Sequence, residues 1–259
     1  MEEPLIREVF HANFKEEESR LLWALSLDFN TIALDTEYPG TIISTPQFAD
    51  EVERYRDVKF NVERTRLIQV GFTLYNPITN ELAGVWQFNL SGFDPTHHVH
   101  SPKAIDLLRK SGIDFSENNT RGVNMWQFAN MLKRIRLGFS NRIQWVTFHG
   151  LYDVAYLLAA MNSVWKLPED IRGFSEAAGE FFSGGIFDVK CMARHNSCMG
   201  LETLAATFGI EREQGWAHQA GSDSLLTAKT FVRTWQWSLV NTVEHYRGRL
   251  FGISLPIGI

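Results

Sequence analysis

Hydrophobic positions along the chain follow two kinds of spacing, and the two spacings predict a mixture of helices and strands. In some segments the apolar side chains recur at three- and four-residue steps, which is typical of amphipathic helices. Shorter apolar runs that end at Gly, Pro or Asn are typical of strands. The helical spacing covers residues 4–28, 101–111, 124–137, 151–161, 168–182, 200–208 and 222–246. The strand pattern covers residues 31–38, 67–75, 82–90, 144–148 and 186–189.

The order of these elements predicts an α/β fold with a mixed β-sheet and helices on both of its faces. Residues 67–90 form a predicted hairpin, because a turn-forming segment separates two apolar runs. Residues 48–65 suit either an amphipathic helix or an irregular segment, and residues 91–123 are expected to be the least regular part. No repeat or Ser/Pro-rich linker divides the 259 residues, so we expect a single domain over 1–259.

Composition narrows the function classes. The net charge is −5, which argues against a non-specific nucleic-acid coat protein but not against a nuclease whose acidic residues hold metal ions. No apolar run approaches the length of a membrane span, and the first residues lack the pattern of a signal peptide. The two cysteines, Cys191 and Cys198, are too few for a disulfide framework. We therefore expect reduced thiols and a cytoplasmic location, with the nucleus as a second compartment.

Two carboxylates stand at the end of the first predicted strand. Asp35 and Glu37 follow the apolar residues 31–34, and residues two apart on a strand point to the same face. Such close charges repel unless a cation lies between them, and oxygen ligands of this kind suit Mg²⁺ or Mn²⁺. A strand that leaves the core for solvent also often ends in acidic residues, so the pair alone leaves both interpretations open.

Three further polar residues are candidates for the same site. Asp153 falls in the first turn of a predicted helix, where capping would be its ordinary role. His218 and Asp223 lie near the predicted C-terminal helix, where Ser222 and Asp223 would ordinarily be caps. Five positions rotate an ideal helix by about 140°, too far for one face. A shared site therefore requires His218 to precede the helix and Asp223 to lie in its first turns.

In this combination and order, the residues resemble the DEDD exonuclease superfamily in its histidine branch. The chain is most similar to the Pop/Caf-type poly(A) ribonucleases, a catalytic subunit of the Ccr–Not deadenylase complex. The resemblance runs from about residue 5 to 253, and its last segment is the most specific. The segments that carry it are residues 33–40, 67–73, 86–89, 148–149, 152–153, 187–190 and 218–227. The chain departs from the family pattern at Tyr38, Gly150-Leu151 and Val154-Ala155, which bears on turn shape and substrate fit.

The resemblance implies a ribonuclease H-like fold and a 3′-to-5′ exoribonuclease that shortens mRNA poly(A) tails and releases 5′ nucleotides. It implies two divalent metal ions, Mg²⁺ or Mn²⁺, held by Asp35, Glu37, Asp153 and Asp223, with Asp35 bridging both ions. His218 would take the proton from the attacking water. These five residues together form the expected catalytic set.

The resemblance also implies partners: the 3′ ends of poly(A) RNA, a Not-type scaffold subunit and a second deadenylase of the Ccr type. Phe88, Phe93 and Tyr38 are candidates for stacking on RNA bases. Two alternatives are a DEDD exonuclease that acts on other short RNA or DNA 3′ ends, and a non-catalytic module of the same fold that docks on a scaffold. The complete acid set argues against the non-catalytic alternative.

Overall fold

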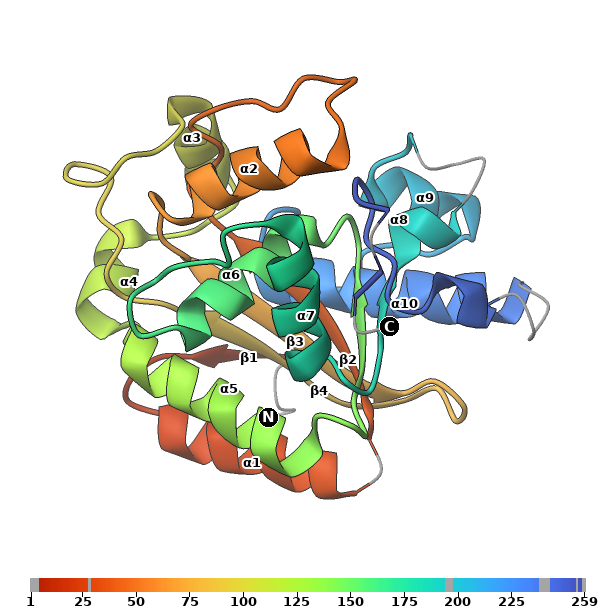
Figure 1. Cartoon of the computed structure of the whole chain (residues 1–259). Coiled ribbons are helices and arrows are strands. Elements are labelled where there is room, and N and C mark those ends of the chain that lie inside the picture. Colours follow the sequence, from red (N-terminus) through yellow and green to blue (C-terminus); the bar gives the residue numbers. More distant parts are fainter. Residues whose placement is uncertain (1–4, 28, 194–197, 238–242, 255, 258–259) are drawn as a thin grey trace.

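A six-stranded mixed sheet forms the centre of the computed structural model, which describes residues 5–27, 29–193, 198–237, 243–254 and 256–257 (Figure 1). The spatial order of the strands is β1-β4-β3-β2-β5-β6. β2–β3 and β3–β4 are antiparallel pairs, whereas β1–β4, β2–β5 and β5–β6 are parallel pairs. The strands are β1 Ile6–Val9, β2 Thr31–Glu37, β3 Gln69–Asn76, β4 Glu81–Asn89, β5 Gln144–Thr147 and β6 Ile186–Asp188.

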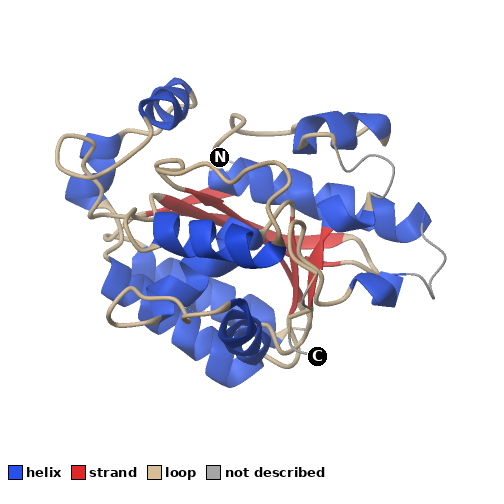
Figure 2. Cartoon of the chain, turned by 45° about the horizontal axis from the view of Figure 1, so that its top comes forward, coloured by secondary structure: helices blue, strands red, loops and turns tan. Residues whose placement is uncertain are grey.

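Helices cover both faces of this sheet, as predicted (Figure 2). Ile32 and Leu34 of β2 join the apolar core that includes α1, α5 and α6, whereas Ala33 joins a second core that includes α10. Alternate residues of β2 therefore face opposite layers. The helices are α1 Phe14–Ser26, α2 Glu51–Val62, α3 Pro102–Lys110, α4 Phe115–Arg121, α5 Met125–Phe139, α6 Leu151–Met161, α7 Ile171–Phe181, α8 Val189–Met192, α9 Leu201–Thr207 and α10 Ala220–Trp237.

The prediction of one helix over residues 4–28 was wrong in its first part. Ile6–Val9 is strand β1, which lies parallel to residues 85–88 of β4. The side chain of Asn13 then accepts a hydrogen bond from the Phe10 N–H and donates one to the Glu8 carbonyl, so the chain turns before α1 begins. A three-residue spacing of two apolar side chains fits both structures, and pairing with β4 decides between them.

Two other segments are more helical than the sequence indicated. Residues 48–65 contain α2, which Asp50 caps by accepting the Glu53 N–H at 2.8 Å. The segment 91–123 contains α4 in addition to the helix predicted near 101–111. The predicted helix over 222–246 includes residues 238–242, which lie outside the described part, and Glu244–Tyr246 is a 3₁₀ turn. No helix of the described residues is long and apolar enough to cross a membrane.

The beginning of α10 lies directly on the sheet, and this contact needs a glycine. A Cβ atom on Gly71 of β3 would lie 1.9 Å from the carbonyl oxygen of Ala220, so no larger residue fits there. Two sheet side chains satisfy the first N–H groups of the helix: Gln69 accepts from Ala220 at 2.9 Å, and Gln87 accepts from Gly221 at 2.8 Å. The first turn of α10 is thereby fixed over β3 and β4.

Candidate active site

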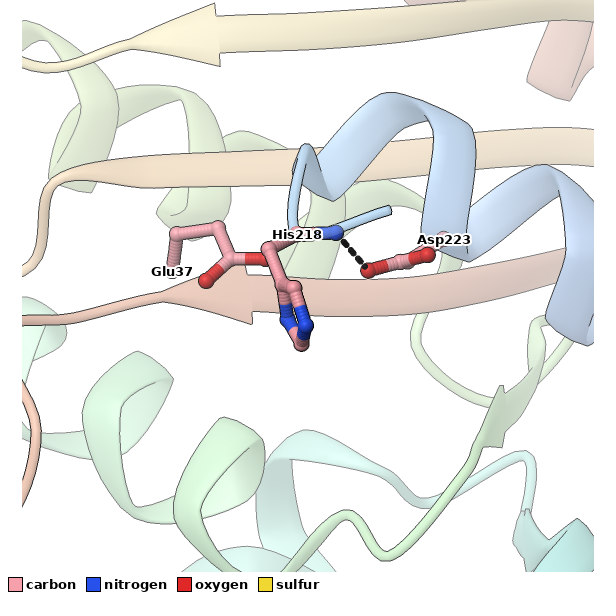
Figure 3. Close-up of side chains that lie close together, drawn as sticks. All are labelled: Glu37, His218 and Asp223. Atoms are coloured by element: carbon pink, nitrogen blue, oxygen red, sulfur yellow. Dashed lines mark hydrogen bonds between the residues drawn. The ribbon is translucent and has the colours of Figure 1, made fainter. Parts of the chain in front are cut away.

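A cavity of about 430 Å³ lies where the end of β2 meets the beginnings of α6 and α10. Asp35, Asp153, His218 and Asp223 line it. Glu37 is only 9% exposed, and ligand atoms of Glu37, His218 and Asp223 all lie within 4.8 Å of one another (Figure 3). The structure therefore brings all five residues of the predicted set to one place.

Strand β2 contributes to this cavity from both of its faces. Asp35 and Glu37 share the face of Ala33, which is the face covered by α10. Thr36 points to the other face, and its hydroxyl donates a 2.5 Å hydrogen bond to Asp153 Oδ1. Thr36 thus holds the third carboxylate, a role that the sequence pattern did not indicate because the residue stands between two more prominent acids.

His218 and Asp223 have the relative placement that the sequence required. His218 precedes α10, and Asp223 lies in the first turn of that helix. The backbone N–H of His218 donates a 2.9 Å hydrogen bond to Asp223 Oδ2 (Figure 3). The backbone of His218 has a φ of +64°, which is uncommon for a residue other than glycine. The loop is thus tied to the helix, and the imidazole is exposed beside the carboxylates.

One cation lies among these acids, and the sequence reasoning missed it. Arg212 lines the cavity and donates to three side chains: Asp223 at 2.6 Å, Ser222 at 2.6 Å and Glu202 at 3.0 Å. It therefore joins α9 to the first turn of α10. Arg212 lies in the irregular segment between those helices, where no hydrophobic periodicity predicts the direction of a side chain.

The buried carboxylates of the cavity repel one another, and this repulsion favours their protonated forms. Burial, followed by the charges of Asp223 and Asp153, raises the pKa of Asp35 and of Glu37 well above the ordinary values. Burial raises the pKa of Asp153 to about 7. Burial also raises the pKa of Asp223, although Arg212 opposes the shift. A divalent cation among these oxygens would offset the repulsion, so the donor set fits Mg²⁺ or Mn²⁺.

A buried carboxylate outside the predicted set shapes one wall of the cavity. Asp188 is fully buried and accepts backbone N–H bonds from His149 at 2.8 Å, Gly150 at 3.0 Å, Lys190 at 2.9 Å and Phe251 at 2.9 Å. These bonds fix the turn that leads from β5 into α6, the helix that carries the third acid. The motif at 187–190 contained this residue, but its place after a short strand gave no role.

Two of the three proposed stacking residues were wrong. Phe88 and Phe93 are 0% and 2% exposed and pack inside apolar clusters, so neither reaches a ligand. Tyr38 does line the cavity, where its ring stacks on Tyr152 with centroids 5.1 Å apart. Stacking between these two rings occupies one face of each.

Most of the residues that depart from the family pattern beside the third acid belong to the core. Leu151, Val154 and Ala155 of α6 are all buried. They therefore change the packing beneath the helix and do not line the cavity.

The chain is similar to members of one ribonuclease family. A model described as "CAF1 family ribonuclease" matches residues 9–137. The chain is 36% identical to probable CCR4-associated factor 1 homolog 7 of Arabidopsis thaliana, over 98% of this chain and 94% of that relative. It is 34% identical to poly(A) ribonuclease pop2 of Schizosaccharomyces pombe, over 87% of this chain and 68% of that relative. It is also 34% identical to CCR4-NOT transcription complex subunit 7 of Caenorhabditis elegans, over 88% of this chain and 75% of that relative.

Two solved structures of proteins from the same family have the same fold as this chain. S. pombe Pop2p in its Mg²⁺- and Mn²⁺-bound form superposes with a TM-score of 0.87 at 31% identity, covering 96% of this chain and all of that one. Yeast CAF1 co-crystallised with the NOT1 MIF4G domain superposes with a TM-score of 0.77 at 21% identity, covering 97% of this chain and all of that one, which supports the fold alone.

Proposed function

The chain belongs to the CAF1 ribonuclease family, and from this premise we propose that it is a 3′-to-5′ exoribonuclease that shortens poly(A) tails. The observation that carries the proposal is the convergence of four carboxylates and one imidazole in a single cavity. Such a set has no use in apolar packing, and bound cations would offset its mutual repulsion. The name of the S. pombe relative gives poly(A) as the substrate of that protein.

We propose that Asp35, Glu37, Asp153 and Asp223 would hold the two divalent ions that the family resemblance implies. The charges of the other three carboxylates all raise the pKa of Asp35, so Asp35 lies among the residues that would hold the ions, and the family resemblance implies that it would hold both. When bound, such ions lower the pKa of water and stabilise charge on the leaving 3′ oxygen. The solved Pop2p structure with Mg²⁺ and Mn²⁺ supports this choice of metals.

The side chains around the ions have separate tasks. His218 is exposed and tethered through its N–H to Asp223, so its imidazole would take the proton of the attacking water. Thr36 and Arg212 would orient Asp153 and Asp223, respectively. Fixed donors of this kind keep carboxylates in place when charge changes during a reaction.

The test is a time course on a 5′-labelled RNA that ends in about twenty adenosines, with Mg²⁺, with Mn²⁺ and with excess chelator. We expect stepwise shortening from the 3′ end with either metal and none with chelator. The same RNA ending in uridines, and the matching DNA, separate a deadenylase from a DEDD exonuclease of wider substrate range. An inactive chain that still binds a scaffold would instead favour the non-catalytic alternative.

The proposal extends to a complex. The names of the relatives place them with CCR4 and in the CCR4-NOT complex, and yeast CAF1 was crystallised with the NOT1 MIF4G domain. We therefore propose a Not-type scaffold and a Ccr-type deadenylase as partners, on surfaces away from the acids. A pull-down with the MIF4G domain tests the first of these, and an Asp35→Ala chain that binds equally well would show that docking and chemistry use different surfaces. A cytoplasmic location, with a nuclear pool, also stays a prediction.

A further inference from the structure

The two walls of the active-site cavity differ in chemistry. The wall formed by the end of β5 and the beginning of α6 carries the rings of Phe148, His149 and Tyr152. The other wall consists of residues 200–203, Arg212 and the segment before α10, and among the described residues that line it the one ring is that of His218. Nucleobases in single strands bind by stacking on rings. A nucleotide whose phosphate lies over the acids therefore finds most of the lining rings at the end of β5 and the beginning of α6, with Tyr38 of the β2 end behind Tyr152.

Among the rings of that wall, the imidazole of His149 is the one most free to meet a ligand. Tyr152 is already stacked on Tyr38, and the ammonium of Lys190 lies 5.4 Å from the centre of the Phe148 ring. His149 is exposed and makes one perpendicular contact, with the Phe251 ring at 5.0 Å. A single perpendicular contact leaves at least one face of the imidazole open. No hydrogen bond to its ring nitrogens comes from the described residues.

The backbone holds His149 in an unusual conformation for a residue with a side chain. Its φ is +62°, a region that favours glycine, and its N–H donates a 2.8 Å bond to the buried carboxylate of Asp188. His218 of the other wall has the same backbone arrangement: its φ is +64°, and its N–H donates a 2.9 Å hydrogen bond to the carboxylate of Asp223. Strain of this kind persists where the surrounding structure fixes it, and it gathers at functional sites. The cavity thus contains two imidazoles fixed in the same way, and the chemistry described above uses only one.

We propose that His149 contacts the substrate, and that its imidazole stacks on the base of the 3′-terminal nucleotide while the scissile phosphate lies over the carboxylates. This inference rests on the exoribonuclease function proposed above. Adenine has a larger ring system than uracil, so a stacking residue at this position also favours an adenosine tail.

The charge state of His149 agrees with stacking on a neutral base. Desolvation of the covered part of the ring, followed by the cations of Lys190 and Arg54, lowers the pKa of His149 below its ordinary value, although part of the side chain stays exposed. The imidazole is therefore neutral at pH 7, which leaves it without the positive charge that would draw it to a phosphate.

The experiment compares the full-length wild type with His149→Ala and His149→Phe in Mg²⁺, on RNAs that end in adenosines or in uridines. Loss of one stacked base weakens binding about ten-fold or more, so His149→Ala should raise KM for the adenosine tail by that factor with little change in kcat. The ratio of kcat/KM for adenosine over uridine tails should fall as well. His149→Phe keeps an aromatic ring and should stay within about three-fold of the wild type. His97→Ala, at an exposed histidine that does not line the cavity, is the matched control.

Two results would overturn the inference. One is a His149→Ala chain with the wild-type KM and the wild-type preference for adenosine. The other is a His149→Phe chain that is folded, as its melting curve shows, yet has lost as much affinity as the alanine variant. A wild-type chain that shortens neither RNA in Mg²⁺ or Mn²⁺ would instead overturn the proposed function.

Discussion

Arg212 and Asp223 form a mostly buried ion pair, in which the guanidinium Nη2 lies 2.6 Å from Asp223 Oδ1. The other oxygen of the same carboxylate accepts the N–H of His218, so protein donors hold both oxygens of the fourth acid. The pair links the cation, the acid and the general base in one loop–helix unit. Its geometry leaves the remaining lone pairs of Asp223 for a metal ion.

The first prediction concerns this ion pair. Arg212→Ala leaves Asp223 buried without its cation, and breaking a buried pair in this way costs about 3 kcal/mol. We expect the free energy of unfolding of the metal-free chain to fall by about that amount at pH 7.5 in urea melts. Arg109→Ala is the control, because the Arg109–Asp106 pair is exposed at 3.7 Å and worth well under about 1 kcal/mol. Equal losses in the two variants would show that Arg212 is not compensating the acids.

The second prediction separates stability from activity at Asp35. Asp35→Asn removes one of several like charges, so the melting temperature of the metal-free chain should hold or rise while turnover nearly disappears. The rise in melting temperature on adding Mn²⁺ should shrink, because that rise follows from ligand binding to the folded state. Thermal melts with chelator and with Mn²⁺ measure both quantities. A large loss of stability in chelator would make Asp35 a structural residue.

The third prediction tests His218 as the base. His218→Asn suits the left-handed backbone and keeps the N–H bond to Asp223, so the loop should keep its shape. Loss of a general base lowers the rate by about 10² to 10⁴. We expect that loss in kcat, with the Mn²⁺-induced rise in melting temperature unchanged. Because the ligand atoms of His218, Glu37 and Asp223 lie within 4.8 Å, the opposite outcome is informative: a lost metal response would make His218 a ligand.

Local patterns predicted most of the fold because most of the strands contain an apolar run bounded by turn residues. The positions of β2 and α6 agree with the sequence to within one residue, since an apolar strand and a Gly-initiated helix leave little choice. Strand β1 could not be predicted in this way. Its four residues become a strand only by pairing with β4, which is nearly eighty positions away. Pairing over such a distance leaves no periodic signal.

The residues of the site also differ in whether the sequence could predict them. The acids and His218 stand at element ends, so their spacing along the chain indicates where they point. Thr36 acts through one hydrogen bond, whereas Arg212 and Asp188 each join several groups. These contacts link separate elements, and they appear only in the folded chain. Phe88 and Phe93 were wrong stacking candidates, because the sequence does not distinguish a phenylalanine of the core from one that lines a binding site.

The last prediction concerns the pH dependence of the metal-free chain. The pKa of Asp153 is about 7 in the folded protein, well above the ordinary value of 3.8. Between these values the folded state binds more protons than the unfolded state, so this group makes unfolding easier as the pH rises through that window. Asp153→Asn removes the titration. We therefore expect the melting temperature of the wild type, relative to that of Asp153→Asn, to fall between pH 5 and pH 7.5 in chelator. Comparing the two chains cancels the titration of groups that do not interact with Asp153. Asp35 and Glu37 do interact with it, and losing its charge lowers their pKa values, which adds to the relative fall of the wild type. Asp106→Asn, at an exposed carboxylate, should show no such relative fall.

Adding Mn²⁺ should reverse the trend for the wild type, because metal binding competes with protons for the same oxygens and strengthens as the pH rises. A wild type that runs parallel to Asp153→Asn across this range in chelator would mean that Asp153 is ionised throughout, and that the repulsion among the four acids is already relieved without metal.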